Sequence, residues 1–210
     1  MHQNFEIIAN NCWGAEVYKD LGLAYNTPFI GLFVPSSCFV KLAARPQYWL
    51  QQPLSFMEIS QYAYWNHFRL REKNYPLALL GNEVEIHFLH YQSQEEASQK
   101  WQRRLQRMSF KPENLYIKFC DRDLLNQDDI QLFEKSSLPH KVFFSAKPYP
   151  GITSNVWLRE FAGDEQVMDG KALYSVSQYY FDAKKWVQGK NPTPSLYKRT
   201  LLEIRLLKNI

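Results

Sequence analysis

Short apolar runs alternate with helix-like segments along most of this chain, and this alternation limits its possible folds more than any other feature. Runs typical of buried strands occupy residues 5–10, 28–34, 115–120 and 141–145. Helix-like segments with capping residues and apolar side chains at helical spacing lie between them. Such alternation favours an α/β fold, a layered and largely parallel sheet flanked by helices. We expect one α/β domain spanning residues 1–210, a length that suits a single core.

Two local patterns are sharper than the rest. Gly81-Asn82 separates two strand-like runs, residues 75–80 and 83–91, and this dipeptide is typical of a two-residue hairpin turn. Ser93 and Glu96 form an S-x-x-E capping box, which predicts a helix from there to about Met108. A further helix is predicted from about Asp128, with that residue as its cap.

Aromatic residues make up 16% of the chain, and many of them fall inside strand or helix patterns where core packing explains them. The unexplained remainder lies in residues 48–75. These belong to an aromatic-rich segment, 46–76, that has no clear period and that we interpret as an insertion or a covering segment. If aromatic rings contact a ligand, this segment is where we expect them.

Composition excludes several classes of protein. Lys and Arg exceed Asp and Glu by 25 − 21 = 4, too small a surplus to indicate nucleic-acid binding. Apolar runs fall far short of the roughly 20 residues of a transmembrane helix, and the N-terminus does not resemble a signal peptide. Three cysteines without a CxxC motif favour a reduced, cytoplasmic protein and give no support for a structural zinc site.

The loop after the first strand is the most suggestive candidate site. Asn10 and Asn11, with the N–H groups of a following helix, suit an oxyanion or a phosphate, and Trp13 stands beside them as a ring for the substrate. Cys12 at a helix N-terminus is a candidate nucleophile, because that position lowers the pKa of a thiol. The alternative is that Cys12 is a small buried residue and that the asparagines satisfy a tight turn.

Two further groups of side chains follow apolar strands. His87 and His90 lie near the end of one strand, and either could act as a general base, but their spacing points them to opposite faces and argues against a metal site. Asp121, Arg122 and Asp123 follow the strand 115–120. A carboxylate there could orient a histidine or bind a sugar hydroxyl, and Arg122 could hold an anion. The alternative is a charged loop with an internal ion pair.

Several strings in the chain resemble a known family. NNCWG at 10–14, YNTPF at 25–29, EIHFLHY at 85–91, LYIKFCDRD at 115–123 and YFDAKKW at 180–186 are similar to the bacterial domain-of-unknown-function family 1919. Its members are often labelled exopolysaccharide biosynthesis proteins. The resemblance covers roughly residues 5–190 and implies a compact α/β domain and a setting among capsule or exopolysaccharide genes. It carries over no catalytic mechanism, so the candidate site residues rest on the residue patterns alone.

The leading functional hypothesis is a transferase that moves an acyl or a glycosyl group onto a saccharide. In the acyl version, His87 or His90 deprotonates a sugar hydroxyl, Asp121 orients that histidine, and the Asn10–Cys12 loop stabilises the oxyanion. In the glycosyl version, the loop and Arg122 hold a nucleotide diphosphate. The alternative is a non-catalytic carbohydrate-binding or assembly protein with exposed rings. The partner is in each case a saccharide or an activated donor; the cofactor is unknown.

Overall fold

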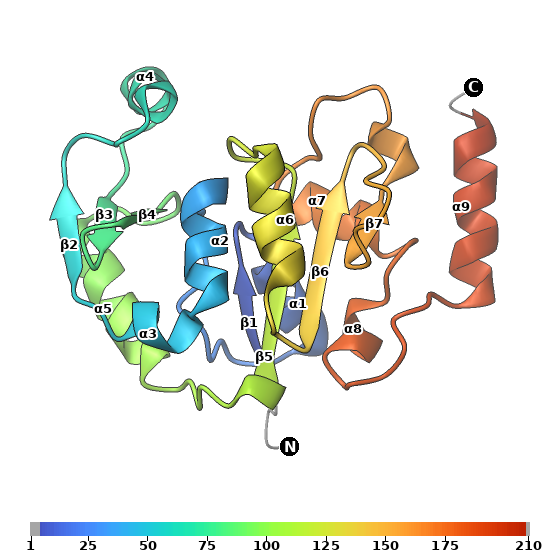
Figure 1. The fold of residues 1–210 in the computed structure, drawn as a ribbon, viewed down its shortest axis with the longest axis horizontal. Helices are drawn as coiled ribbons and strands as arrows, with labels where there is room; N and C mark the ends of the chain where they lie inside the picture. Colours follow the sequence, from blue (N-terminus) through green and yellow to red (C-terminus); the bar gives the residue numbers. More distant parts are fainter. Residues whose placement is uncertain (1–4, 209–210) are drawn as a thin grey trace.

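The main sheet of the molecule consists of four parallel strands. In the computed structural model, which describes residues 5–208, these strands are β1 (Glu6–Ala9), β5 (Leu115–Cys120), β6 (His140–Ser145) and β7 (Asn155–Trp157), in the order β1-β5-β6-β7. All three pairings are parallel, so the carboxyl ends of the strands meet at one edge (Figure 1). The expected layered and largely parallel α/β sheet is confirmed.

Helices cover both faces of this sheet, and successive side chains of β5 are therefore buried in two different cores. Ile117 and Phe119 pack in the core with α2 (Ser36–Ala44) and α6 (Gln127–Lys135). Tyr116 and Cys120 point to the other core, with α1 (Trp13–Leu21), α7 (Gly170–Ser177) and α8 (Ala183–Trp186). Gly14 lets α1 approach β1 closely, since a Cβ there would lie 3.1 Å from Ile7.

A second, antiparallel sheet has the order β2-β3-β4 and stands beside α2. Its strands are β2 (Leu54–Met57), β3 (Leu77–Leu80) and β4 (Val84–His87). The predicted hairpin is confirmed: Gly81 and Asn82 both have positive φ, 61° and 62°, as its tight turn requires. α5 (Gln94–Leu105) follows, and its cap Ser93 accepts the Glu96 N–H as predicted, although the Glu96 carboxylate accepts from Gln92 N–H instead of Ser93.

Residues 46–76 are more than a covering segment. They form α3 (Pro46–Leu50), β2 and α4 (Ala63–Arg71), and β2 completes the antiparallel sheet by pairing with β3. α4 projects at the upper left of Figure 1, on the side toward which β1, β5 and β6 run. The aromatic-rich segment therefore brings rings to the carboxyl edge of the parallel sheet.

The expected strand at 28–34 is wrong. Proline at both flanks and a positive φ of 72° at Gly31 prevent a continuous ladder. The segment runs between the sheets instead: Val34 N–H donates to the Asn10 carbonyl after β1, at 2.9 Å, and Phe33 exchanges two backbone hydrogen bonds with His87 of β4. Residues 28–34 thus join the two sheets through their backbone.

The remaining differences concern helix ends and the C-terminal part. α6 is capped by Asn126 in a capping box with Asp129, so the prediction of Asp128 as the cap is wrong. Two short 3₁₀ helices, Pro112–Asn114 and Arg159–Phe161, precede β5 and follow β7. α9 (Leu196–Lys208) lies at the right edge of Figure 1. In residues 5–208 no helix is long and apolar enough to cross a membrane. Residues 1–4 and 209–210 of the expected domain lie outside the described part.

Candidate functional site

A cavity of about 400 Å³ opens at the carboxyl edge of the parallel sheet, where β1 and β5 end. This position is the usual ligand site of open α/β sheets, because the loops after the strands converge there. We call it the acidic cavity. Its lining joins the loops after β1 and β5 to α4 and to the loop before α7: Asn11, Cys12, Phe33, Tyr64, Trp65, Phe68, Leu89, Asp121, Arg122, Asp123, Leu124, Leu125, Glu165, Gln166 and Asp169.

Asp121 holds the loops of this cavity together. Its two oxygens accept the backbone N–H groups of Ala146, at 2.6 Å, and Val167, at 2.9 Å, and so tie the end of β5 to the end of β6 and to the loop before α7. Burial raises the pKa of Asp121 despite these hydrogen bonds. The prediction that Asp121 orients a histidine is wrong, since its two oxygens bind backbone N–H groups and no histidine is among the described residues that line the cavity.

Asp123 is the most unusual residue of the site. Its backbone is left-handed, with φ of 70°, and Leu124 follows with φ of 65°, a strained arrangement for two residues that are not glycine. The N-terminus of α2 fixes this backbone: Ser36 N–H donates to the Asp123 carbonyl, and the Ser36 hydroxyl donates to the Arg122 carbonyl. The Asp123 side chain is thereby held against the cavity wall.

The carboxyl group of Asp123 is only partly satisfied. Oδ1 lies 3.8 Å from Arg122 Nε, whereas Oδ2 is buried without a hydrogen-bond partner among the described residues. Burial raises the pKa of Asp123 to about 7; Asp169 acts in the same direction, and Arg122 and Lys118 act against it. A carboxyl group with this pKa can take up and release a proton near neutral pH, which suits a general base.

Arg122 connects the same loop to the loop before α7. Its Nη1 donates to the Val167 carbonyl at 3.1 Å, and its side chain is 31% exposed. Asp121-Arg122-Asp123 does not present two free carboxylates, because Asp121 already binds two N–H groups. Within residues 5–208, no group of three or more His, Cys, Asp or Glu side chains is arranged to hold a metal ion.

Beneath the cavity lies a buried polar cluster around Lys118 of β5. The Lys118 ammonium donates to Asn10 Oδ1 at 3.1 Å and to Asn11 Oδ1 at 2.8 Å, and both amide nitrogens point to the Cys120 sulfur. Burial lowers the pKa of Lys118. Asn10 is therefore a supporting residue, and Asn11, which also accepts the Trp13 N–H, is the one that reaches the cavity.

Cys12 reaches the cavity but lacks the properties of a nucleophile. Burial raises its pKa to about 11, and Asp169 and Asp123 act in the same direction. The Cys12 thiol contacts the Leu32 carbonyl at 3.9 Å. The expectation that a helix N-terminus lowers this pKa is wrong here, because burial and the two carboxylates outweigh it.

Trp13 is a core residue. Its ring is fully buried and packs at 5.4 Å from Phe144 and 6.2 Å from Trp186, while its Nε1 donates to the Ser177 hydroxyl at 3.0 Å. The prediction that Trp13 binds substrate is wrong, because the first turn of α1 directs its side chain into the core and away from the cavity.

The two histidines do not line the acidic cavity. His87 is fully buried, with Nε2 at 2.6 Å from Glu85 and Nδ1 at 3.0 Å from the Tyr75 hydroxyl. Burial lowers the pKa of His87, so the imidazole is neutral, with Nε2–H donating to Glu85 and the Tyr75 hydroxyl donating to Nδ1. His90 lies at the surface, where its ring is partly covered by neighbouring groups. This partial desolvation, together with the positive charge of Lys73, lowers its pKa. The structure therefore does not bring either histidine to Asp121.

The aromatic segment supplies the opposite wall of the cavity. Trp65 and Phe68 of α4 lie beside Phe33, whose ring centroid is 4.6 Å from that of Trp65. Behind them, the His87 ring stacks on Phe33 at 4.3 Å. Trp65 Nε1 is a buried donor without a hydrogen-bond partner among the described residues. Two residues that line the cavity, Asp123 and Trp65, thus each carry a buried polar atom without a hydrogen-bond partner in residues 5–208.

The comparison with known proteins settles the family. A family model described as "Domain of unknown function (DUF1919)" matches residues 1–188. The chain belongs to this family. A curated relative from Haemophilus influenzae (strain ATCC 51907 / DSM 11121 / KW20 / Rd), named "Uncharacterized protein", is 36% identical over 189 residues, which are 88% of this chain and 84% of the relative. The predicted membership of DUF1919 is confirmed; the exopolysaccharide label is not part of the match and stays a prediction.

The site of this DUF1919 chain includes residues that sequence analysis did not single out. Lys118 could have been found, because a lysine inside an otherwise apolar strand signals a buried polar contact. Away from the acidic cavity, Glu85 could have been found as the partner of His87, since residues two apart share one face of a strand. Glu165 and Asp169 carried no such signal: they lie on a loop that only the tertiary fold brings to β5.

Proposed function

We propose that this DUF1919 chain is a transferase that acts on saccharides, with Asp123 as its general base. The observation that carries the proposal is that two buried atoms of lining residues, Asp123 Oδ2 and Trp65 Nε1, have no hydrogen-bond partner within the described part of the chain. A hydroxyl group is chemically complementary to each of them, because it donates to a carboxylate and accepts from an indole N–H. Burying either group unpaired costs about 1–3 kcal/mol, which a bound hydroxyl would recover.

The rest of the lining also fits a neutral sugar. Carboxylates accept hydrogen bonds from hydroxyl groups, and aromatic rings pack on the apolar C–H faces of a sugar ring. The cavity has both, with Trp65, Phe68 and Phe33 on one side and Asp123 and Asp169 on the other. Its volume lies within the range of about 300–1,000 Å³ that holds small ligands.

The proposed reaction needs one proton transfer. Asp123 Oδ2 takes the proton of an acceptor hydroxyl while the hydroxyl oxygen attacks the electrophilic carbon of the donor, an acyl carbonyl carbon or an anomeric carbon. The new C–O bond forms as the bond from that carbon to the leaving group breaks, and the leaving group departs with the electron pair. Arg122, the cation in the described lining, lies beside Asp123 to hold negative charge.

We place this activity in the cytoplasm and in the assembly of capsule or exopolysaccharide. Three free thiols, Cys12, Cys38 and Cys120, support a reducing compartment. The polysaccharide setting rests on the label often given to members of the family.

The test is a turnover assay on the full chain, with neutral oligosaccharide acceptors and two donor classes, coenzyme A thioesters and nucleotide sugars. Mass spectrometry should show transfer of one acyl or glycosyl group. Asp123→Asn should lower the rate about 10²–10⁴-fold, and the wild-type rate should rise with pH through about 7. Asp128→Asn, an exposed carboxylate on α6, is the matched control and should keep full activity.

A carbohydrate-binding protein without catalysis is the second candidate, favoured by the rings of the cavity. It predicts that neutral oligosaccharides raise the thermal midpoint, by about 5–10 °C at 100 times the dissociation constant, while no donor yields product. Binding without turnover would replace the transferase proposal with this one. The absence of both binding and turnover would contradict both.

A further inference from the structure

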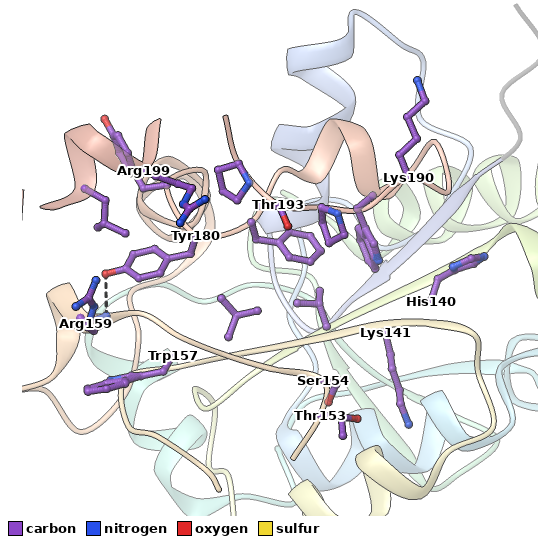
Figure 2. A pocket seen from close by; sticks show the side chains of 18 of the residues that line it. His140, Lys141, Thr153, Ser154, Trp157, Arg159, Tyr180, Lys190, Thr193 and Arg199 are labelled. Carbon is purple, nitrogen blue, oxygen red and sulfur yellow. Dashed lines mark hydrogen bonds between the residues drawn. The ribbon is translucent and has the colours of Figure 1, made fainter. Parts of the chain in front are cut away.

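A second and larger cavity, of about 790 Å³, lies on the β6–β7 side of the parallel sheet, away from β1. Its floor is formed by β6 and β7 and its opposite wall by residues 189–203, which run from α8 into α9 (Figure 2). The family match ends at residue 188, so this wall belongs to a part of the chain outside the match. We call it the basic cavity.

The charge of the basic cavity is opposite to that of the acidic cavity. Its lining holds Lys141, Arg159, Lys190 and Arg199 against one carboxylate, Glu203. Glu203 is already paired with Arg159 at 3.0 Å. Lys141 is also engaged, since its ammonium donates to the Phe133 carbonyl, at 3.2 Å, and the Ser136 carbonyl, at 2.8 Å, at the end of α6.

Two cations of this cavity, Lys190 and Arg199, are available to an anionic ligand, although the Lys190 ammonium also donates to the exposed Gln188 amide oxygen at 2.9 Å. Neither Lys190 nor Arg199 forms an ion pair with a carboxylate of the described residues, and both are exposed. Figure 2 shows them at opposite ends of the cavity, Arg199 near Tyr180 and Lys190 above His140, with Thr193 between them. An elongated ligand with more than one negative charge would reach both.

Aromatic rings line the same space. The Trp157 indole is 37% exposed and is fixed by a hydrogen bond of 3.0 Å from its Nε1 to the Ala146 carbonyl. The Tyr180 hydroxyl accepts the Arg159 N–H at 3.1 Å and donates to the Glu160 carboxylate, so this ring is also held in place (Figure 2). Flat rings held by hydrogen bonds can support the faces of sugar rings without a large loss of side-chain entropy.

We propose that the basic cavity binds an acidic oligosaccharide, with Arg199 and Lys190 pairing with its anionic groups and with Trp157 and Tyr180 supporting its sugar rings. The saccharide part rests on the proposed function, whereas the anionic part rests on the charges of the cavity itself. The acidic cavity repels such a segment, so the two cavities select different parts of a saccharide or different saccharides.

The test measures binding to the full chain by calorimetry with matched probes. Tetragalacturonate carries the carboxylates, its methyl ester carries none, and a phosphorylated oligosaccharide tests whether phosphate replaces carboxylate. We expect tetragalacturonate to bind at least tenfold more tightly than its ester, and to bind more weakly as salt is raised. Lys190→Gln combined with Arg199→Gln should weaken binding at least tenfold. Arg103→Gln, an exposed cation on α5, is the matched control and should leave it unchanged.

The outcomes separate this proposal from the transferase proposal. Asp123→Asn should leave tetragalacturonate binding unchanged while it removes turnover, and the Lys190/Arg199 double variant should leave turnover of a neutral acceptor unchanged. Equal binding of acid and ester, absence of binding, or binding of uridine diphosphate or a single-stranded oligonucleotide in place of the saccharide would overturn the basic-cavity proposal. Circular dichroism of the double variant checks for a folding defect. We expect none, because both cations are exposed.

Discussion

The two cavities of this chain differ in how they are built as well as in charge. The acidic cavity rests on features that oppose stability: a left-handed backbone at Asp123 and Leu124, a buried carboxyl oxygen without a partner among the described residues and, beneath them, a buried lysine. The basic cavity uses long, exposed side chains such as Lys190 and Arg199 that cost the fold little. Strain and buried charge gathered at one place indicate a chemical site, whereas exposed cations around rings indicate binding.

The largest expected effect lies between the cavities, at Trp13. Trp13→Ala should lower the free energy of unfolding by about 3–5 kcal/mol, because it leaves a hole between Phe144 and Trp186. Both cavities should loosen, since Cys12 lines one and Trp186 the other. Denaturant titration measures this, with Tyr64→Ala, a 59% exposed ring of the acidic cavity, as the control. If Trp13→Ala left the free energy of unfolding unchanged, Trp13 would again be a candidate ligand-binding residue.

Asp123→Asn should stabilise the protein while it removes activity. The pKa of Asp123 is about 7 in the folded chain against about 3.9 unfolded, so wild-type stability falls as pH rises from about 4 to about 7. The neutral amide avoids this loss, and at pH 8 the variant should be more stable by about 2–4 kcal/mol. Unfolding curves at several pH values measure it. A variant that is less stable than wild type at pH 8 would show that the carboxylate is well satisfied.

Leu124→Gly should give a smaller stabilisation, about 1 kcal/mol. Glycine removes the strain of a φ of 65°, and the leucine side chain is already 42% exposed, so little burial is lost. Part of the gain is offset by the greater entropy of glycine in the unfolded chain. The thermal midpoint should rise by about 2–4 °C. A lower midpoint would mean that packing of Leu124 outweighs its backbone strain.

The smallest effect is expected at the basic cavity. Arg199→Gln should change the free energy of unfolding by less than about 0.5 kcal/mol, since its side chain is exposed and forms no ion pair with the rest of the described chain. The same denaturant titration measures it. A decrease of the free energy of unfolding by more than about 1 kcal/mol would show that Arg199 stabilises the fold. The two cavities would then not differ in how much their residues contribute to stability.

The sequence predicted those parts of the site that depend on local chain geometry. The hairpin at Gly81-Asn82 and the strand Leu115–Cys120 are correct because turn chemistry and apolar runs act over a few residues. Asn11, Cys12 and the Asp121–Asp123 loop do meet at one cavity, as the rule for strand ends predicts.

The parts that depend on tertiary packing were not predictable in the same way. Trp13 is one residue beyond the cavity, but its direction follows from the packing of α1 against α7 and α8. The pKa of Cys12 follows from burial and from Asp169, 157 positions along the chain, so the helix N-terminus alone gave the wrong sign. Segment 28–34 is apolar enough for a strand, yet Gly31 and the flanking prolines turn it into a bridge.

That bridge, residues 28–34, has a consequence for how the molecule opens. Its backbone bonds to Asn10 after β1 through Val34 and to β4 through Phe33, so the two sheets cannot separate without breaking one of these attachments. We therefore expect the amide protons of the two sheets to exchange with solvent in a single cooperative unit. A ligand that contacts the Phe33 ring in the acidic cavity would slow amide hydrogen exchange in β1 and β4 together.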